Sequence, residues 1–375
     1  MFASAFFIYT MHLSSLKLTS FRNFETLKLT PSAGINVLHG KNGSGKSNLL
    51  EAIFVLCLGR SQRGNKDTDI IKHEQESYRV EGTMHDDDRS IDLAVAVMRR
   101  GRKQITINGV KSKASELYEK FSVVAAGPED SEILAGPPSV RRLFLDLYIS
   151  QQSTKYLENI TKYSRILSQK NAALKENIEF DSFNFLLAET GAKIIIARQL
   201  FLETLNKSAG SFYSKFSKNG QLDIKYKPSA LEEIESEIKV DESRIKEQFE
   251  AKLKQVKERE MILKSSVVGP HRDEIEFMIN SFPARTHGSQ GEWRSAAIAL
   301  KLSVYQLLKE KRGFAPILLL DEIFAELDEN RSAAVIDSFN DLGQLFLTTA
   351  LEPPVRLAEQ ALNLKIDSGQ IEAVK

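Results

Sequence analysis

Eight consecutive residues near the start of the chain, Gly40 to Ser47, constrain its fold more than any other feature. They read Gly-Lys-Asn-Gly-Ser-Gly-Lys-Ser, follow a short apolar run at 35–38, and precede a segment at 48–56 whose apolar residues recur with helical spacing. This order predicts a strand, a glycine-rich loop and a helix. The glycines allow a turn so tight that successive backbone N–H groups point into one concavity, beside the positive end of the helix. The sequence therefore predicts a loop that binds a polyphosphate.

The two side chains at the end of this loop have separate expected roles. We expect Lys46 to reach the β- and γ-phosphates as a point charge, and the Ser47 hydroxyl to ligate Mg²⁺. A glycine-rich turn followed by Lys-Ser by chance is the alternative, but the full spacing between a strand and a helix favours nucleotide binding. The residues expected to bind ATP are Gly40, Lys41, Asn42, Gly43, Ser44, Gly45, Lys46 and Ser47, and Lys46 is also expected to be catalytic.

The composition limits which classes of protein remain open. With 375 residues, of which 42% are hydrophobic and 27% charged, the chain is long enough for two domains or one domain with an insertion, and has a soluble protein's composition. Its net charge of +1 means that any contact with DNA must come from a local basic patch. No apolar run approaches the ~20 residues that span a bilayer, so no membrane association is expected. The single cysteine, Cys57, is expected to be a buried thiol in a cytosolic chain.

Residues 1–10 are apolar but lack the basic region of a secretory signal peptide. The small residues at 3–5 precede the apolar core of this segment instead of following it. We therefore expect residues 1–10 to be a loosely held extension, or translation to start at Met11.

From residue 11 the pattern is rich in strands. Alternating apolar residues at 16–18 and 27–29 flank a turn, so two strands are expected to pair there. Further alternation between 78 and 97, followed by a strand at 104–107 and an Asn-Gly turn, predicts an antiparallel sheet beside the nucleotide-binding core.

A helical pattern begins at residue 137. Helices are expected over 183–216 and 231–263, and the second is dense in Glu and Lys but lacks the sustained heptads of a long coiled coil. We expect a discontinuous nucleotide-binding domain made of residues 11–136 and 265–375, interrupted by a helical lobe at 137–264.

A second set of motif residues lies near the C-terminus. The apolar run Ile-Leu-Leu-Leu at 317–320 ends in Asp321 and Glu322, as in a buried strand. Alone, it would be a strand with an acidic turn. Together with the phosphate loop, it predicts that Asp321 holds the Mg²⁺ shell and that Glu322 is catalytic, orienting or deprotonating the attacking water.

Two short segments flank this strand in sequence. Residues 288–291, Gly-Ser-Gln-Gly, precede a helical run at 293–307, and Ser-x-Gly at a helix start offers a hydroxyl and N–H groups to an anion. A helix N-cap is the more frequent explanation. Residues 325–328, Ala-Glu-Leu-Asp, directly follow the acidic strand.

Together these four elements resemble an ABC-type ATPase head. The expected fold class is therefore α/β: a discontinuous P-loop ABC-type ATPase head with an antiparallel β subdomain and an inserted helical lobe. The resemblance implies that ATP is bound between two protomers, with Ser289 and Gly291 of one facing the γ-phosphate held by Lys46 of the other. Asp328 would lie across the same interface.

Longer sequences are similar to those of the RecF family. They are Phe21-Arg22-Asn23-Phe24, Asn48-Leu49-Leu50-Glu51-Ala52-Ile53, Pro128-Glu129-Asp130, Arg141-Arg142-x-Phe144-Leu145-Asp146, Gly269-Pro270-His271-Arg272-Asp273-Glu274 and Gly288-Ser289-Gln290-Gly291. This resemblance implies an ATP-dependent homodimer with weak, DNA-stimulated ATPase activity that binds single-strand gaps or junctions in DNA. It also implies RecR as a partner, recombinase loading in DNA repair, replication and the SOS response, and a cytoplasmic, nucleoid-associated location.

Two positions depart from related heads. The Ser-x-Gly segment continues with Glu292-Trp293-Arg294, where related heads usually carry a Gln-rich or smaller sequence. Where many ABC heads place a histidine after the acidic strand, this chain has threonines at 348 and 349, which suggests slow hydrolysis used as a clock.

Two other classes of ABC-type protein share the four elements. A subunit that transduces energy to a membrane transporter has a much shorter interval than the 289 − 40 = 249 positions here. An SMC-like chromosome ATPase would carry very long heptads and a hinge in that interval. The length of the insertion and the missing coiled coil favour the repair mediator.

DNA contacts are expected from basic residues on exposed loops. The first candidates are Arg60, Arg63 and Lys66, and others lie at 99–103 and 141–142. A solvated surface charge is the common alternative for each. Contacts to phosphates would be strongly salt-dependent and would carry no base-sequence information.

Two pairs of motif residues have open roles. Arg22 and Asn23 either line the nucleotide pocket or shape the turn between two strands. His271 and Arg272 either satisfy the core or couple the moving parts of the head.

Overall fold

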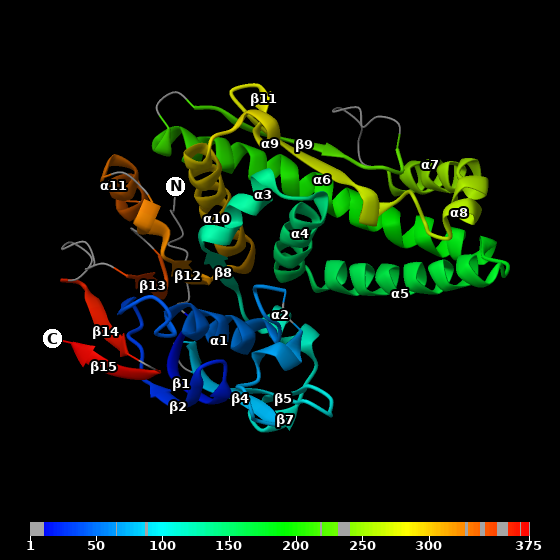
Figure 1. Ribbon diagram of the computed structural model, residues 1–375. Helices are drawn as coiled ribbons and strands as arrows, with labels where there is room; N and C mark the ends of the chain where they lie inside the picture. Colours follow the sequence, from blue (N-terminus) through cyan, green and yellow to red (C-terminus); the bar gives the residue numbers. More distant parts are fainter. Residues whose placement is uncertain are drawn as a thin grey trace, which may run out of the picture. The chain divides into compact units, whose positions relative to one another are not determined.

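The computed structural model describes residues 11–64, 66–86, 89–217, 220–231, 241–326, 329–337, 342–350, 359–367 and 369–374. The chain divides into two units, one formed by residues 1–129 and 304–375 and the other by residues 130–303. Each unit has its own sheets and helices (Figure 1). The first unit carries the phosphate loop and the acidic strand, and the second carries the Ser-x-Gly segment.

The first unit contains a six-stranded, mostly parallel sheet in the order β15-β14-β3-β13-β12-β8. Its strands are β3 (Ile35–His39), β8 (Val123–Ala126), β12 (Ile317–Asp321), β13 (Leu345–Thr349), β14 (Ala361–Asp367) and β15 (Gln370–Val374). The central strands are apolar and buried, as is usual where both faces of a sheet are covered. Because β3, β13 and β12 are parallel, their carboxyl ends meet at one edge. The phosphate loop and the acidic residues follow these strands there.

A second six-stranded sheet in this unit is antiparallel, in the order β2-β1-β4-β5-β6-β7. Its strands are β1 (Met11–Phe21), β2 (Phe24–Leu29), β4 (Ser77–Asp86), β5 (Arg89–Met98), β6 (Gln104–Ile107) and β7 (Val110–Lys111). The predicted pairing of 16–18 with 27–29 is confirmed. Asn108 and Gly109 both have positive φ, 50° and 75°, as the predicted two-residue hairpin turn requires.

Helix α1 (Lys46–Leu58) contacts strands of both sheets. All residues from Leu49 to Leu58 are buried, so apolar side chains are favourable on every side of this helix. They include Cys57, whose thiol is free and buried, as expected. The other helical segments in the described part of this unit are η1 (Asp67–Ile70), α2 (Ala114–Lys120), η4 (Ile323–Glu326) and α11 (Glu329–Asp337).

The second unit is mainly helical, with one three-stranded antiparallel sheet in the order β11-β10-β9. Its helices are α3 (Glu132–Ala135), α4 (Pro138–Gln152), α5 (Thr154–Glu176), α6 (Asp181–Phe216), α7 (Glu242–Gln255), α8 (Lys257–Leu263), η3 (Pro270–Arg272) and α9 (Ala284–His287). Its strands are β9 (Leu222–Lys227), β10 (Glu274–Ile279) and β11 (Phe282–Pro283). Two elements cross the boundary between the units, η2 (Pro128–Ser131) and α10 (Gln290–Arg312).

Two features of this unit differ from the expectation. The described part of the charged segment at 231–263 forms two helices, α7 and α8, which meet at Val256. Residues 130–136 and 265–303, which we expected in the nucleotide-binding domain, belong to the second unit. The reason is that β10 pairs along its whole length with β9, while α9 contacts β10.

Candidate nucleotide-binding site

The phosphate loop joins β3 to α1 and has the backbone conformation that its glycines allow. Gly40, Gly43 and Gly45 have φ values of 154°, 79° and 113°. A Cβ atom at Gly40 would lie 2.2 Å from the carbonyl oxygen of Ile366, and one at Gly45 would lie 2.5 Å from the side-chain nitrogen Nδ2 of Asn23. Both distances are too short for a side chain at either position. Gly45 is the N-cap of α1 and brings no side-chain acceptor to the helix start, so the first N–H groups of the helix can serve a ligand.

Lys46 is a buried cation whose main contacts are with its own loop. Its side chain is 3% exposed, and its Nζ donates to the carbonyl oxygens of Gly40 and Lys41 at 2.8 and 3.2 Å. A carboxylate oxygen of Glu322 lies 3.2 Å from the same nitrogen. In the same loop, the Ser44 hydroxyl is buried with no hydrogen-bond partner among the described residues. A buried cation, an unsatisfied hydroxyl and converging N–H donors fit the oxygens of a polyphosphate.

The two predicted acidic residues lie at the end of β12, beside this loop. Ser47 Oγ donates to Asp321 Oδ1 at 2.9 Å, and Thr348 Oγ1 donates to the same oxygen at 2.6 Å. The backbone N–H of Glu322 donates to the Thr348 hydroxyl at 2.9 Å, and Glu322 has a positive φ of 50°. The structure thus brings Lys46 and Ser47 next to Asp321 and Glu322, although the two pairs of residues are more than 270 positions apart in the chain.

The Ser47 hydroxyl and the Asp321 carboxylate fit Mg²⁺. This ion prefers oxygen ligands, and proteins usually hold it through one or two side chains together with water and substrate phosphates. The hydrogen bond between Ser47 and Asp321 already places their oxygens together, at 2.9 Å. These two residues would hold the ion.

The role of Thr348 was not visible in the sequence, where it stood out only as a replacement for histidine. Parallel pairing of β12 with β13 places Thr348 opposite Asp321. Its hydroxyl orients that carboxylate and accepts the Glu322 N–H. A threonine at the carboxyl end of an apolar strand was the available signal, but its meaning depends on which strand lies next to β12.

The turn between β1 and β2 supports the phosphate loop and α1. Asn23 donates to the carbonyl oxygen of Ser44 at 3.1 Å and accepts from Asn48 at 2.8 Å. Arg22 binds the buried carboxylate of Glu51 on α1 through two nitrogens, both at 2.9 Å. Asn23 therefore contacts the nucleotide loop, whereas Arg22 fixes its helix.

Glu51 also fixes the segment that follows α1. Ser61 Oγ donates to Glu51 Oε1 at 2.5 Å and accepts from the backbone N–H of Arg63 at 3.1 Å. Burial raises the pKa of Glu51, but hydrogen bonds from Arg22 and Ser61 outweigh burial and hold the pKa below its usual value. The Arg63 guanidinium lies 3.7 Å from Asp321 Oδ2. Arg63, which we expected to contact DNA, thus lies beside the acidic strand.

The other DNA candidates lie in different surroundings. Arg60 is half-buried and forms a hydrogen bond with Tyr118. Lys66 is exposed, at the N-cap of η1. Arg141 is buried and binds Glu274 at 2.8 Å, so its charge is used inside the second unit.

The Ser-x-Gly segment starts α10. The Glu292 backbone N–H donates to Ser289 Oγ at 3.3 Å, and the Glu292 carboxylate accepts from the Ser289 N–H and hydroxyl, both at 2.8 Å. This reciprocal pair is a capping box. Trp293 Nε1 donates to the Ala284 carbonyl oxygen at 2.7 Å, which anchors the segment before the helix. The unusual Glu292 and Trp293 thus hold the segment in shape, with Ser289 exposed and Gly291 half-buried.

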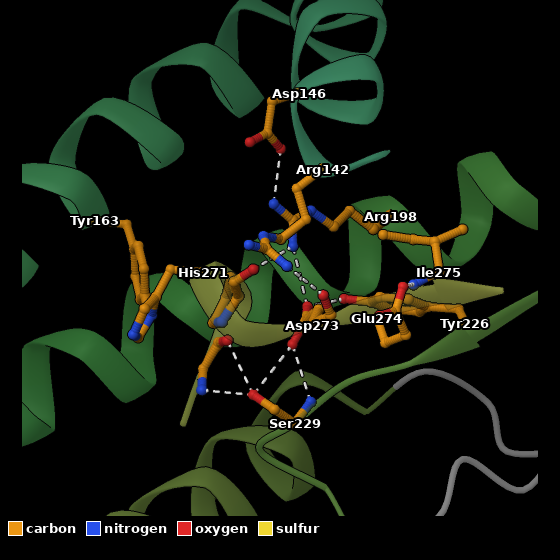
Figure 2. Close-up of polar contacts among 12 residues, drawn as sticks. Arg142, Asp146, Tyr163, Arg198, Tyr226, Ser229, His271, Asp273, Glu274 and Ile275 are labelled. Atoms are coloured by element: carbon orange, nitrogen blue, oxygen red, sulfur yellow. Dashed lines mark hydrogen bonds and ion pairs between the residues drawn. The ribbon is translucent and has the colours of Figure 1, made fainter. Parts of the chain in front are cut away.

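A second cluster of buried charge lies within the second unit, around Arg198 of α6 (Figure 2). Arg198 is 1% exposed and forms ion pairs with Asp146 at 2.8 Å and Asp273 at 3.0 Å. It also donates to the Tyr156 hydroxyl at 3.1 Å and the Pro270 carbonyl oxygen at 2.7 Å. These contacts join α4, α5, α6 and η3.

The carboxylate of Asp273 is the acceptor at the centre of this cluster (Figure 2). Besides Arg198, the Tyr226 hydroxyl donates to it, and the Ser229 N–H donates at 2.9 Å. Burial, followed by the nearby Asp273 charge, raises the pKa of Tyr226 well above its usual value, so the phenol stays a donor. Arg142 donates to the Asp273 carbonyl oxygen at 2.8 Å.

His271 belongs to the same motif as Asp273 and satisfies the interior of the second unit. Its ring bonds the Tyr163 hydroxyl at 2.8 Å and the Ser266 carbonyl oxygen at 3.2 Å. Burial, with further contributions from the charges of Arg272 and Arg142, lowers its pKa to about 4. The neutral ring therefore accepts from Tyr163 and donates to Ser266.

Two remaining expectations concern other parts of the chain. Asp328, expected at a dimer interface, lies outside the described residues. In the described part of the chain, no helix has the length and apolar character needed to cross a bilayer.

The chain is similar to known proteins over nearly its whole length. The RecF/RecN/SMC N terminal domain family matches residues 12–372. The DNA replication and repair protein RecF of Bacillus cytotoxicus is 32% identical over 371 residues, which cover 96% of this chain and 98% of that protein. A solved structure of the recombination mediator protein RecF-ATP in the RecFOR pathway matches with a TM-score of 0.90 at 33% identity, over 100% of both chains. An Smc head domain from Pyrococcus furiosus, 18% identical, shares the fold with a TM-score of 0.55 over 97% of this chain and 96% of that chain.

Proposed function

The chain belongs to the RecF family, and on this basis we propose that it is an ATP-dependent DNA-binding protein of DNA repair, replication and recombination. ATP closes a homodimer on DNA, and slow hydrolysis opens it. The fold that carries this switch is the ATPase head fold shared by RecF and SMC proteins.

One observation carries the proposal: the phosphate loop and the acidic strand meet at one edge of the parallel sheet. There Ser47 forms a hydrogen bond with Asp321, and Lys46 forms an ion pair with Glu322. Each contributes the group that its proposed role needs: a buried ammonium for phosphate charge, a hydroxyl and a carboxylate for Mg²⁺, and a second carboxylate for water. The similarity to a RecF-ATP structure over the whole chain supports ATP as the nucleotide.

Nucleotide binding changes the partners of Lys46. Its ammonium exchanges the carbonyl oxygens of Gly40 and Lys41 for phosphate oxygens, which are charged and therefore stronger acceptors. Glu322, which now pairs with Lys46, becomes free to orient or deprotonate the attacking water. Bound Mg²⁺ would neutralise phosphate charge, and Ser47 and Asp321 would hold it.

The second protomer completes the site in this proposal. Ser289 and Gly291 of one subunit face the γ-phosphate bound by the other, and Asp328 lies across the same interface. The exposed start of α10 supports this role, because a hydroxyl and the N–H groups of a helix N-terminus favour an anion. Facing a phosphate, the Ser289 hydroxyl would donate to it instead of to Glu292.

The proposed substrate is DNA with a single-strand gap or a junction between single strand and duplex. The matching RecF-ATP structure is of a recombination mediator in the RecFOR pathway, which supports this assignment and RecR as a partner. The protein would assist recombinase loading, with weak DNA-stimulated ATPase activity, in the cytoplasm at the nucleoid. Arg63 belongs to the nucleotide-binding site in this proposal, because its guanidinium faces Asp321.

The dimer is tested by two substitutions with different expected failures. Lys46→Ala should abolish both nucleotide binding and ATP-induced dimers, because it removes the buried phosphate partner. Ser289→Arg should bind nucleotide normally but form no ATP-induced dimer, since a large charged side chain cannot enter the shared interface. Ser289→Ala, which stays small, is the control. Normal dimers of Ser289→Arg, measured by light scattering with ATP and Mg²⁺, would contradict the shared site.

The DNA substrate is tested with Glu322→Gln, which should trap the closed dimer. Its binding to gapped duplex and to intact duplex of equal length is measured with and without ATP. We expect ATP-dependent binding that is tighter on the gapped molecule. Absence of any ATP-dependent DNA binding would refute the proposed function.

A further inference from the structure

The antiparallel sheet of the first unit ends in a segment of one charge sign. We call residues 98–113 the basic hairpin; it comprises the end of β5, the turn that follows, β6, β7 and two further residues. Its charged residues are Arg99, Arg100, Arg102, Lys103, Lys111 and Lys113, and it contains no Asp or Glu. The whole chain has 51 basic and 50 acidic residues, so this concentration of six positive charges is local.

All charged residues of the basic hairpin except Lys103 are exposed, and Lys111 lies on the solvent side of the sheet. Ile105 and Ile107 are buried, so the alternate positions Gln104 and Thr106 of β6 point outward. Lys111 pairs with Thr106 and therefore shares its outer face. β7 is the last strand of the sheet and pairs with β6; it lies near the label of β5 in Figure 1.

Most charges of the basic hairpin have no carboxylate partner. Among the described residues, no ion pair involves Arg99, Arg100, Arg102, Lys111 or Lys113. The centre of the same sheet is different, because Lys17 and Arg79 both pair with Glu81, at 3.1 and 3.0 Å. Positive charge is thus neutralised in the middle of the sheet and left unneutralised at its edge.

Two residues of the turn, Arg99 and Lys103, hold the hairpin in place. Arg99 Nε donates to the Gln75 carbonyl oxygen at 2.7 Å. Lys103 binds Asp67 at 2.7 Å and donates to the Gly59 carbonyl oxygen at 2.6 Å. Lys103 thereby attaches the hairpin to the segment after α1, the segment that carries Lys66. The hairpin is thus joined to a segment 44 positions earlier in the sequence.

We propose that the basic hairpin is a binding surface for the phosphate backbone of duplex DNA, with Arg100, Arg102 and Lys111 as direct contacts. This inference rests on the proposed function and names the residues that hold its DNA. Guanidinium and ammonium groups are the usual phosphate partners, and the outward amide and hydroxyl of Gln104 and Thr106 are donors of the kind that supplement them. The charges extend from the turn to the edge strand, which suits a polyanion better than a single ion. Binding through this surface is independent of base sequence.

The test neutralises three contacts together. Arg100→Gln, Arg102→Gln and Lys111→Gln are combined in the Glu322→Gln background, and binding to duplex DNA is measured with ATP and Mg²⁺ across a series of salt concentrations. Each lost phosphate contact reduces the slope of log affinity against log salt by ~0.9, so the slope should fall by about 2.7. Because three phosphate contacts are lost, we expect the affinity for duplex DNA at moderate salt to fall by roughly tenfold or more. The loss should be equal for DNA of different base sequences.

A matched control removes three charges elsewhere. Lys175, Lys207 and Lys225 are exposed, lie in the second unit, and have no ion pair among the described residues. Their combined change to Gln should leave the salt slope unchanged. ATP binding and circular dichroism of both triple variants should match the parent, which shows that each is folded.

The outcomes separate this inference from the proposed function. Unchanged affinity and slope in the hairpin variant, while its parent binds DNA with ATP, overturn the inference and leave the function standing. An equal loss in the lysine control also overturns it, because net charge would then explain the effect. Loss of binding to an acidic protein partner with intact DNA binding would assign the surface to that partner instead. A parent that binds no DNA refutes the proposed function itself.

Discussion

Each unit of the molecule buries a cation, and the two cations differ in how much negative charge the protein places around them. Lys46, 3% exposed, is held by two carbonyl oxygens of its own loop and by the partly exposed Glu322, beside the unsatisfied hydroxyl of Ser44. Arg198, 1% exposed, is held by two carboxylates, a carbonyl oxygen and a tyrosine hydroxyl.

This difference indicates that the clusters around Lys46 and Arg198 have different roles. Burying a charge is unfavourable unless hydrogen bonds and opposite charges compensate, so Arg198, which is paired with two carboxylates, can hold elements together without a ligand. Lys46 is paired with one partly exposed carboxylate and lies beside an unsatisfied hydroxyl, so its cluster gains from a ligand that brings further negatively charged oxygens. The comparison predicts structural effects from changes around Arg198 and functional effects from changes around Lys46.

The largest expected effect is that of Arg198→Ala. The substitution leaves the buried Asp273 carboxylate without its cation and should destabilise the second unit by about 3–5 kcal/mol. Urea unfolding followed by Trp293 fluorescence measures it well, because Trp293 is the single tryptophan and lies in this unit. Arg165→Ala, at an exposed position of α5, is the control. An unchanged urea midpoint would mean that the cluster around Arg198 contributes nothing to stability.

The next largest expected effect is the change of folding stability with pH that His271 causes. Burial lowers its pKa to about 4, whereas the unfolded chain has the ordinary value near 6.5. Between pH 6.5 and pH 4, His271 is protonated in the unfolded chain but neutral in the folded protein. The free energy of unfolding should therefore fall as the pH drops from 6.5 to 4, and it should not depend on His271 above pH 6.5. The linkage amounts to roughly 3 kcal/mol at pH 4. His271→Gln should flatten this part of the stability curve, and an equally steep curve in the variant would exclude His271 as the cause.

Thr348→Val should affect chemistry and not folding. It removes the hydroxyl that orients Asp321 and accepts the Glu322 N–H, so we expect ATP hydrolysis to fall roughly 10- to 100-fold. ATP binding measured without Mg²⁺ should change little. Thr348→Ser keeps the hydroxyl and should keep most activity. If the serine variant were as slow as the valine variant, the methyl group and not the hydrogen bonds would be responsible.

The smallest effect, and the sharpest comparison, comes from the same substitution in both clusters. Ser44→Ala removes a hydroxyl with no partner and should leave the stability of the nucleotide-free protein unchanged while weakening ATP binding by about tenfold. Ser229→Ala removes hydrogen bonds to Gly269 and Asp273 and should cost about 1–2 kcal/mol with no effect on ATP affinity. Thermal unfolding with and without ATP measures both. A destabilised nucleotide-free Ser44→Ala protein would erase the distinction between the clusters.

Much of the nucleotide-binding site could be predicted because its parts are local. The phosphate loop is one continuous segment, and an apolar strand ending in Asp321 and Glu322 is another. The antiparallel hairpins were also predictable, since alternation and the Asn108-Gly109 turn act over a few residues. The roles of Thr348 and Arg63 were not, because each depends on how its segment lies against Asp321. The capping box of Ser289 and Glu292 fits the alternative role that the sequence left open for this segment, a helix N-cap.

By itself, the sequence determined a strand-loop-helix of the kind that binds phosphate groups and an apolar strand that ends in two carboxylates, because short segments encode both through backbone freedom and periodic burial. Only the tertiary structure decided which distant groups meet: Thr348 with Asp321, Lys103 with Asp67, and Arg198 with Asp146 and Asp273. The physical reason is that these contacts depend on strand order, sheet register and helix packing. No local pattern of residues specifies those relations, and they alone determine whether a buried charge is left for a ligand or used by the fold.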